Sequence, residues 1–537
     1  MCGIFLALGH VSYNDCSGCV NTLGLRGPEG ASTRAFSNGF MTFTRLAING
    51  LSGGGMQPMD LSGTIFATNG EIYNWKELAS SHGFVCKTGS DCEIIGHLYQ
   101  KFGKGDNESL ASMFQAIDGV FATVLVDFDT QRVVVARDPF GVRPLYKGFR
   151  TVYTKDRQME SQVFFGSELK SLSDLCQRIE YFSPGTYEVY DLASRKLLHK
   201  SAYFQTLSKS LPAFESVEAS SSAIRTALEV AVKKRMMTER PCAALLSGGL
   251  DSSLIAALVA KELRSVGALP LKTFSIGMKG SHDLYYAKKV ADWIGSDHTE
   301  IVLNETEFFD AIPDTIYAIE SYDTTTVRAS VGNWLVAKAI ATKTECKVVF
   351  NGDGADEVFG SYLYMFGAPS PLEYEKEVLR LLKDIHMFDV LRSDRSISSN
   401  GLEARTPFLD KSFVQTVLQI PVRFRQPSAT QPEKWLLRRA FDDGLTLPRE
   451  VLWRRKEAFS DGVSGSRPWY EVTQEMSASI VSKWANYKHN QPFNAEMAYY
   501  RTLFDSVYPE MSHLVPYFWM PRWSKSSDPS AKTLENY

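Results

Sequence analysis

The sequence is poor in cysteine and has no surplus of charge of either sign. Only 8 of its 537 residues are cysteines, which is too few for a disulfide-rich secreted scaffold. The pair Cys16 and Cys19 lacks a second pair at zinc-finger spacing, so we expect neither a metal site nor a redox site there. The 58 basic and 61 acidic residues give a formal net charge of −3, which offers no electrostatic case for nucleic-acid binding.

Long hydrophobic runs are also absent. The longest apolar stretches, such as CAALL at 242–246 and FATVLV at 121–126, are far shorter than the roughly 20 residues that span a bilayer. The N-terminus has no basic region followed by a long apolar segment and a small-residue cleavage site. We therefore expect a cytoplasmic protein without a membrane partner. No internal repeat is visible.

Two compositional regimes predict two domains of different class. Up to about residue 205, short apolar runs such as FMTF, TIFA and RVVVA are punctuated by Gly, Asn, Asp and Pro, which is typical of a mostly β domain. From about residue 216, helical periods at 220–236, 252–266, 284–294, 331–342 and 372–392 alternate with strand candidates at 242–246, 271–276 and 347–350. This alternation predicts a parallel sheet covered by helices. We assign 2–205 to the first domain, 206–216 to a linker, 217–523 to the second domain and 524–537 to a disordered tail.

A glycine-rich segment, SGGLDSS at 247–253, lies between the strand candidate CAALL and the helical run LIAALVAKEL. At such a strand–helix turn, free backbone N–H groups and the positive end of the helix form a cradle for an anion. Asp251 would repel a phosphate unless it also holds a Mg²⁺ ion that the phosphates share. The segment is not a kinase-type phosphate loop, because no Gly-Lys-Ser/Thr follows. A tight turn with a serine cap is the alternative.

A cluster of acidic residues follows another apolar strand candidate. KVVF runs into NGDGADEVFGSY at 351–362, which offers Asp353, Asp356 and Glu357 on a glycine-rich turn. Ligands of an open α/β sheet bind at the carboxyl ends of its strands, so this position favours a site over a solvated helix cap. Two further segments contain residues suited to anions: YDTTTVRAS at 322–330 and WRRKEAFSDG at 453–462, where Lys456 could also be a plain surface charge.

These segments together resemble a known family. SGGLDSS is similar to the pyrophosphate loop of ATP pyrophosphatases, which cleave ATP between its α and β phosphates. With YDTTTVRAS, NGDGADEVFGSYLY, EARTPFLD and RRKEAFSDG in the same order, the chain resembles the glutamine-hydrolysing asparagine synthetases over essentially its whole length. The resemblance implies that, with ATP and Mg²⁺, the side-chain carboxylate of aspartate is activated as β-aspartyl-AMP, which ammonia then attacks.

The resemblance also assigns residues to the synthetase site. The expected ATP-binding residues are Leu246, Ser247, Gly248, Gly249, Asp251, Ser252, Ile276, Asn351 and Gly352. The expected aspartate-binding residues are Thr325, Arg328, Asp353, Asp356 and Glu357. Asp251 and Asp356 match the magnesium-binding carboxylates. Lys456 matches the catalytic lysine that faces the reacting phosphorus, where a fixed positive charge stabilises the transition state.

One departure from the family concerns the proposed base of the amination step. The family loop usually reads Ser-Gly-Glu-Gly-Ser-Asp-Glu, and this chain has Asn351, Asp353 and Ala355 at the first, third and fifth places. Asp353 keeps the carboxylate expected to take a proton from the attacking ammonia, but it is one methylene shorter. General-base catalysis depends first on reach, so this departure bears on rate and substrate more than on fold.

The N-terminal half resembles the class II glutamine amidotransferase domain. The matching segments are MCGIF, LRGPEG at 25–30, TRLAING at 44–50, NGEIYN at 69–74, TGSDCE at 88–93 and ARDPFGVRPLY at 136–146. This resemblance implies an α+β first domain with an N-terminal-nucleophile αββα sandwich. The second domain is then an α/β ATP pyrophosphatase domain with a parallel sheet, similar to the adenine nucleotide alpha hydrolases.

Each residue carried over from the amidotransferases has a chemical task. Cys2 is the nucleophile, and its own α-amine is the base once Met1 is removed. Asn69 and the backbone N–H of Gly70 form the oxyanion hole. Arg45 binds the α-carboxylate of glutamine, while Asp91 and Glu71 receive its α-ammonium group.

Two positions in this half depart from the family pattern. Leu25 and Glu29 stand where the family commonly has His and Asp. We expect Leu25 to alter the hydrogen bonding around the glutamine-site loop without abolishing it.

The leading hypothesis is the synthesis of asparagine from aspartate and glutamine, which gives glutamate, AMP and pyrophosphate, with channelled ammonia from glutamine hydrolysis at Cys2. The expected partners are these small molecules, and the resemblance suggests a homodimer. One alternative is a related amide-forming synthetase, such as a β-lactam synthetase, that acts on another carboxylate. The other is a catalytically impaired homologue with a binding role.

Overall fold

The computed structural model describes residues 1–153, 159–206 and 213–530. They divide into two compact units. Unit 1 comprises Met1–Thr206 together with Met237–Arg240, and unit 2 comprises Leu207–Met236 and Pro241–Tyr537. The division after Thr206 falls at the start of the linker expected at 206–216, of which 207–212 lie outside the described residues. The grouping of 237–240 with unit 1 has no signal in the sequence.

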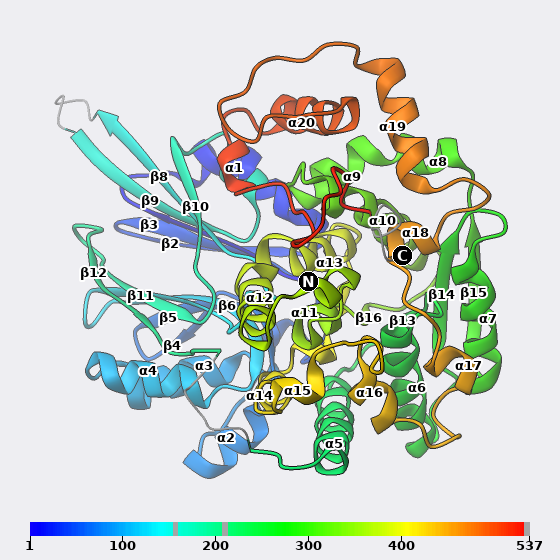
Figure 1. Ribbon diagram of the computed structural model, residues 1–537. Helices are drawn as coiled ribbons and strands as arrows, with labels where there is room; N and C mark the ends of the chain where they lie inside the picture. The colour runs from blue at the N-terminus through cyan, green and yellow to red at the C-terminus, as the bar shows by residue number, and fades with distance from the viewer. Residues whose placement is uncertain (154–158, 207–212, 531–537) are drawn as a thin grey trace. The chain divides into compact units, whose positions relative to one another are not determined.

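Unit 1 contains two six-stranded antiparallel sheets, which Figure 1 shows in blue and cyan. The strand orders are β10-β8-β9-β1-β3-β2 and β12-β11-β7-β6-β5-β4. The strands are β1 (Gly3–Leu8), β2 (Ala31–Phe36), β3 (Gly39–Thr44), β4 (Met59–Leu61), β5 (Thr64–Ile72), β6 (Gly119–Asp127), β7 (Arg132–Arg137), β8 (Tyr146–Tyr153), β9 (Met159–Gly166), β10 (Arg178–Tyr181), β11 (Thr186–Asp191) and β12 (Leu197–Ala202). The helices are α1 (Tyr13–Asn21), α2 (Trp75–His82), α3 (Glu93–Leu98) and α4 (Asn107–Ala116).

The layers of unit 1 form the αββα sandwich that the resemblance implied. Apolar residues of β1, β3, β5, β6, β7 and β9 make one core between the two sheets. Alternate residues of β5 and β6, such as Phe66 and Leu125, face the opposite way and pack against α2, α3 and α4. On the outer face of the first sheet, the ring of Tyr13 from α1 packs edge-on against Phe40. Because strands buried on both faces need apolar residues at most positions, TIFA and FATVLV lack a polar alternation.

Unit 2 is built around a parallel sheet, as predicted, and this sheet has five strands, two more than the three strand candidates in the sequence. Its strand order is β15-β14-β13-β16-β17. The strands are β13 (Cys242–Leu245), β14 (Lys272–Gly277), β15 (Asp297–Val302), β16 (Val348–Phe350) and β17 (Glu403–Arg405). The chain adds β14 and β15 on one side of β13 and then returns to add β16 and β17 on the other side. The loops after β13 and β16 therefore flank the switch point of the sheet, where ligands of such sheets bind.

Helices account for most of the rest of unit 2 (Figure 1). They are α5 (Val217–Arg235), α6 (Leu250–Ser265), α7 (His282–Ile294), α8 (Glu305–Asp310), α9 (Ile312–Ile319), α10 (Thr324–Lys343), α11 (Ala355–Phe359), α12 (Pro371–Asp384), α13 (Asp389–Ser398), α14 (Lys411–Leu418), α15 (Val422–Arg425), α16 (Trp435–Ala440), α17 (Arg449–Leu452), α18 (Phe459–Gly462), α19 (Trp469–Ile480) and α20 (Ala495–Val507). Over the described residues, no helix is both long enough and apolar enough to cross a membrane.

The structure differs from two expectations in unit 2. The single helix expected at 372–392 is broken, because Phe388 leaves the helical backbone region (φ −129°, ψ −92°) and packs its ring against Tyr517. The segment 524–530 is not a disordered tail. Asp528 and Ser530 are buried, and they bond to Arg328 and Asp461 respectively. Residues 531–537 lie outside the described residues.

Two glycines at the ends of α6 provide a test of the turn that precedes it. Gly248 (φ +71°) and Gly267 (φ +69°) are both left-handed, but only at Gly248 would a Cβ meet neighbours, at 2.4 Å from Tyr286 Cβ. We expect Gly267→Ala to cost about 1 kcal/mol of unfolding free energy from backbone strain alone. Gly248→Ala should cost about 1–3 kcal/mol more, because the clash adds to the strain.

Urea unfolding followed by tryptophan fluorescence measures this difference, since every tryptophan except Trp75 lies in unit 2. Equal losses in the two variants would show that the packing of Gly248 against Tyr286 is unimportant.

Candidate active sites

The thiol of Cys2 lies at one end of the first sheet of unit 1. Gly3 of β1 pairs with Thr44 of β3, so the antiparallel register brings Cys2 to the residues that follow β3. The Cys2 Sγ lies 3.5 Å from both the backbone N and the backbone O of Leu46. The predicted nucleophile and the predicted glutamine-binding residue Arg45 thus occupy the same edge of the sheet.

A buried side-chain amide faces the Cys2 backbone from the other sheet. Asn69 is on β5, and its Oδ1 accepts a hydrogen bond from the Cys2 N–H at 3.2 Å. Its Nδ2 is buried and has no hydrogen-bond partner among the described residues. A buried donor left unpaired on a side chain that contacts the backbone of the predicted nucleophile is suited to an oxyanion hole before substrate binds. Gly70 follows it, and a Cβ there would lie 2.0 Å from the Val120 carbonyl oxygen.

The charged residues expected to bind glutamine are each held by a partner. Arg45 is buried and donates to the carbonyl oxygens of Ser52 (2.8 Å) and Gly50 (2.5 Å). Asp91 accepts the Ile72 N–H at 2.6 Å. Glu71 accepts from Asn49 Nδ2 at 2.6 Å. These contacts restrict the rotamers of all three charged side chains, which lowers the entropy cost of binding a small polar ligand.

Two residues near Cys2, Arg26 and Glu168, were missed by sequence reasoning. Arg26 is fully buried and donates from Nε to the carbonyl oxygen of Cys2 (2.9 Å). It also pairs with buried Glu168 (2.8 Å). Arg26 belongs to the quoted LRGPEG segment, so its place in a motif was the available signal.

Leu25, one of the departures from the family, is 51% exposed. Met1 is buried, and while it is attached the Cys2 nitrogen is an amide and cannot act as a base.

The second site is a cavity of about 260 Å³ in unit 2 at the switch point of the sheet. Its lining includes the following predicted residues: Leu246, Ser247, Gly249, Asp251, Ser252, Ile276, Thr325, Asn351, Gly352, Asp353, Asp356, Glu357 and Lys456. The loops after β13 and β16 touch, since a Cβ on Gly352 would lie 2.7 Å from the Ser252 nitrogen. The Ser247 hydroxyl lies 3.0 Å from that of Ser252 and accepts the Gly249 N–H.

Two predicted residues do not line this cavity. Gly248 packs against Tyr286, and its carbonyl oxygen accepts from Arg454 (3.1 Å). Arg328 is buried in ion pairs with Glu496 (2.5 Å) and Asp528 (2.8 Å).

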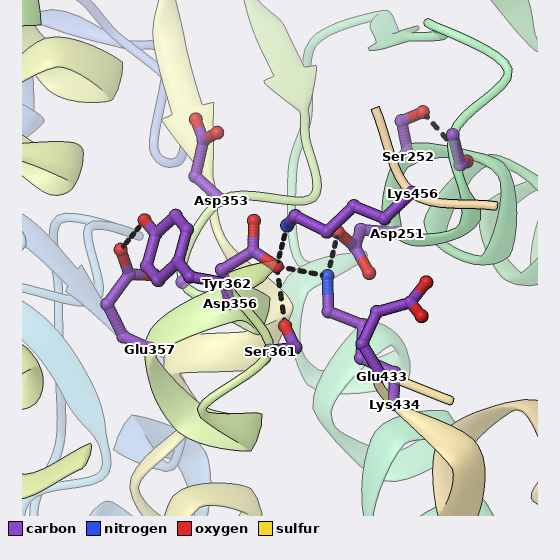
Figure 2. A network of polar contacts seen from close by, with 12 residues as sticks. Asp251, Ser252, Asp353, Asp356, Glu357, Ser361, Tyr362, Glu433, Lys434 and Lys456 are labelled. Carbon is purple, nitrogen blue, oxygen red and sulfur yellow. Dashed lines mark hydrogen bonds and ion pairs between the residues drawn. The ribbon is translucent and has the colours of Figure 1, made fainter. Parts of the chain in front are cut away.

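Lys434 joins the two acidic loops and was not predicted. Its side chain is 2% exposed, and its Nζ lies 2.5 Å from Asp251 Oδ2 and 2.6 Å from Asp356 Oδ1. Figure 2 shows it between these carboxylates, with Lys456 contacting the same Asp356 oxygen. Burial alone would lower the pKa of Lys434, but the two carboxylates outweigh burial and raise that pKa above its usual range. Burial opposes ionisation of Asp356 as well, yet the two lysines hold its pKa well below the usual range.

The same carboxylates are suited to a divalent cation. Asp251 Oδ1 is buried and has no hydrogen-bond partner among the described residues, so one hard oxygen ligand is unused. Elsewhere in the described chain, Cys86, Glu93 and His97 form a group whose ligand atoms lie within 4.8 Å of one another. There the Glu93 carboxylate already accepts hydrogen bonds from the backbone N–H groups of Lys87 and Thr88, in the loop before α3.

Asp353 lies apart from the lysines, on the other side of the loop (Figure 2). Its Oδ1 is 3.3 Å from Arg392 Nη2, and Arg392 also contacts Asp389. Burial raises the pKa of Asp353 to about 6, although the Arg392 guanidinium opposes this shift. At pH 7–8 most of this carboxyl is therefore ionised and can accept a proton.

Two more polar groups face the cavity. The Thr325 hydroxyl is buried and has no partner among the described residues. Glu357 accepts from the Tyr362 hydroxyl at 2.5 Å.

Comparisons with known proteins cover both units. The glutamine amidotransferase domain family matches residues 1–223, and the asparagine synthase family matches residues 223–376 and 368–525. Three curated relatives are named asparagine synthetase [glutamine-hydrolyzing]. The relative from Gallus gallus is 39% identical, that from Bos taurus 39% and that from Homo sapiens 38%. Each alignment covers 100% of this chain and 99% of the relative. The chain belongs to the family of glutamine-hydrolysing asparagine synthetases.

Proposed function

We propose that this protein makes L-asparagine from L-aspartate, with glutamine as the nitrogen donor and ATP as the activating substrate. The products are L-asparagine, L-glutamate, AMP and pyrophosphate. The observation that carries the proposal is the cavity at the switch point, where Asp251, Asp356, Lys434 and Lys456 meet between two glycine-rich loops. The full-length likeness to curated asparagine synthetases supports the same assignment.

Activation of aspartate is assigned to the loops after β13 and β16. The N-terminus of α6 and the hydroxyls of Ser247 and Ser252 are suited to hold the leaving pyrophosphate. Asp251 and Asp356 would hold Mg²⁺, which when bound offsets the negative charge of the phosphates. Lys434 and Lys456 place fixed positive charge where the reaction builds negative charge. Thr325, with its unpaired hydroxyl, is suited to bind the aspartate substrate.

Amination is assigned to Asp353. Its carboxylate would take a proton as ammonia attacks the activated carbonyl carbon and AMP leaves. Arg392 at 3.3 Å keeps this carboxylate oriented. Leu246, Ile276 and Asn351 then belong to the nucleotide pocket, and Glu357 to the aspartate pocket.

Ammonia is supplied by unit 1. After removal of Met1, the α-amine of Cys2 takes the thiol proton and the thiolate attacks the glutamine amide carbonyl. The C–N bond then breaks, ammonia leaves with the proton from the α-amine, and water hydrolyses the thioester to release glutamate. Asn69 Nδ2 and the Gly70 N–H stabilise the oxyanion. Arg45 binds the α-carboxylate, and Asp91 with Glu71 binds the α-ammonium group. The cytoplasmic location and the homodimer expected from the sequence stay predictions.

A product assay tests the proposal as a whole. The protein is incubated with ATP, Mg²⁺, aspartate and glutamine, and asparagine, glutamate, AMP and pyrophosphate are quantified. The proposal requires equal amounts of asparagine, AMP and pyrophosphate. The appearance of ADP and phosphate, or a lack of dependence on aspartate, would refute it.

Replacement of the nucleophile should separate the two half-reactions. In Cys2→Ala, glutamine hydrolysis and glutamine-dependent synthesis should fall at least about 1,000-fold, because the covalent intermediate cannot form. Synthesis from added ammonia should keep the wild-type rate, and mass spectrometry of the wild-type protein should show that Met1 is absent. Survival of both activities in Cys2→Ala would place the glutaminase nucleophile elsewhere.

Replacement of the buried Lys434 should abolish the synthetase reaction and leave glutamine hydrolysis intact. Lys434→Met keeps the side-chain length but leaves Asp251 and Asp356 facing each other without the shared cation. We expect a loss of about 3–5 kcal/mol in unfolding free energy and at least a 100-fold loss of AMP formation, with glutamine hydrolysis unchanged.

Exposed Lys272, which pairs with Asp297 at 2.7 Å, gives the matched control Lys272→Met. That variant should lose less than about 1 kcal/mol. If Lys434→Met also loses less than about 1 kcal/mol of unfolding free energy and keeps AMP formation, Lys434 has no role in the site.

Loss of the Asp353 carboxylate should block amination alone. We expect Asp353→Asn to lower ammonia-dependent synthesis by about 100-fold or more. Aspartate-dependent exchange of pyrophosphate into ATP, which needs only the first step, should persist. Loss of both ammonia-dependent synthesis and pyrophosphate exchange would assign Asp353 to the activation of aspartate instead. Asp353→Glu tests reach, because a rise in turnover would show that the shorter carboxylate limits amination.

A further inference from the structure

Four residues that connect α5 to β13 belong to unit 1, although the chain on both sides of them belongs to unit 2. They are Met237, Thr238, Glu239 and Arg240, and we refer to them as the 237–240 segment. The Thr238 hydroxyl accepts the Arg240 N–H (2.9 Å) and donates to the Arg240 carbonyl oxygen (3.1 Å). The segment is therefore a compact turn with a defined shape of its own.

The 237–240 segment bonds to the backbone of the loop that follows β3. Arg240 Nε donates to the Ala47 carbonyl oxygen (2.9 Å), and the Glu239 N–H donates to the Ile48 carbonyl oxygen (3.0 Å). The Gly50 N–H donates to Glu239 Oε1 (2.7 Å). Within residues 47–50, three of the four residues thus have a backbone group fixed by Glu239 or Arg240.

Glu29 completes this arrangement from the same unit. Its Oε2 accepts the Ala47 N–H (2.8 Å), and its Oε1 pairs with Arg240 Nη2. Ala47 is therefore held at both its N–H and its carbonyl oxygen. Glu29 is one of the departures from the family noted in the sequence, where Asp is usual. Its longer side chain is the one that spans from Ala47 to Arg240.

The loop held in this way is the one that shapes the proposed glutamine site. Leu46, next to Ala47, contacts the Cys2 thiol through both its backbone N and O at 3.5 Å. The Gly50 carbonyl oxygen accepts from Arg45 at 2.5 Å. Asn49 donates to Glu71 at 2.6 Å. A shift of residues 47–50 would therefore move the surroundings of the nucleophile and release the guanidinium that is proposed to bind glutamine.

We propose that Glu239 and Arg240 are positioning residues for glutamine binding, acting together with Glu29 through the 45–50 loop. This inference rests on the glutaminase role proposed for unit 1. Neither residue is placed at the reacting atoms, and both act by fixing the loop that carries Arg45. Loss of such support weakens the binding of glutamine in the ground state and in the transition state alike, so KM rises while kcat changes little.

Arg225 provides a matched control for Arg240. It also donates to a backbone carbonyl oxygen, that of Ala440 (3.1 Å), and to a carboxylate, that of Asp443 (2.7 Å). Arg225 makes two further contacts, an ion pair with Glu229 at 3.5 Å and a cation–π contact with the Phe441 ring, so its replacement removes at least as many contacts as that of Arg240. The exposure of the two pairs is similar, at 32% and 23% for Arg225 and Asp443 against 28% and 29% for Arg240 and Glu29. Arg225 lies in unit 2, so Arg225→Ala removes the same kinds of contact without touching the 45–50 loop.

The test measures glutamine hydrolysis without ATP and ammonia-dependent asparagine synthesis in the full-length chain. For Arg240→Ala we expect KM for glutamine to rise about tenfold and kcat to change less than about twofold. Ammonia-dependent synthesis should be unchanged, and Arg225→Ala should match the wild type in both assays. An unchanged KM in Arg240→Ala overturns the inference. A wild-type protein that hydrolyses no glutamine overturns the proposed function instead.

Two further variants test whether the residues act as one unit. If Glu29 and Arg240 support the same loop, Glu29→Ala combined with Arg240→Ala should raise KM little beyond the larger single effect. Full additivity would overturn their joint action. Should Arg240→Ala fail to fold, Arg240→Lys keeps the charge beside Glu29 but loses the Nε donor to Ala47. We expect it to raise KM about threefold, and no rise would overturn the inference.

Discussion

The proposed synthetase site depends on a balance of buried charge. Asp251 and Asp356 lie in the first turns of α6 and α11, about a hundred residues apart in sequence, and two carboxylates brought this close would repel each other without a shared cation. Lys434, at 2.5 Å and 2.6 Å from them, supplies that cation from a third segment of the chain. The two glycine-rich turns touch, and the negative charge beside their contact is compensated by Lys434. The proposed phosphate cradle and the proposed metal ligands lie at that contact, whereas Asp353 is held separately by Arg392 at 3.3 Å.

The local parts of this arrangement could be read from the sequence. SGGLDSS and NGDGADE each follow an apolar strand candidate, and strand–turn–helix chemistry is short-range, so both turns lie where their residues predicted. The parallel sheet followed from the apolar patterns, and the αββα sandwich followed from the family resemblance. For these two turns, the position directly after a strand linked their residues to a cavity, whereas Thr325 and Lys456 were linked to it by the family resemblance.

The parts that escaped prediction depend on partners remote in the chain. Lys434 lies in QPEKWLL, which has no local mark of a site, and its partner Asp251 is 183 residues away. Arg328 lies in a segment that is typical of anion binding, yet its guanidinium pairs with Glu496 and Asp528, which are 168 and 200 residues further along. The burial of Asp528 likewise cannot be read from a polar terminal composition. Spacing along the chain does not reveal which opposite charge will be buried against a given residue.

The grouping of residues 237–240 with unit 1 also bears on how this family can be recombined. The amidotransferase family match ends at residue 223, so the segment that supports its glutamine loop lies beyond the conventional end of the domain. A chimera that exchanges the first 206 residues between two relatives would join the 45–50 loop of one parent to the supporting turn of the other. An exchange that keeps the loop with its supporting turn has to carry residues 237–240 along with the first 206 residues, as the division into compact units does.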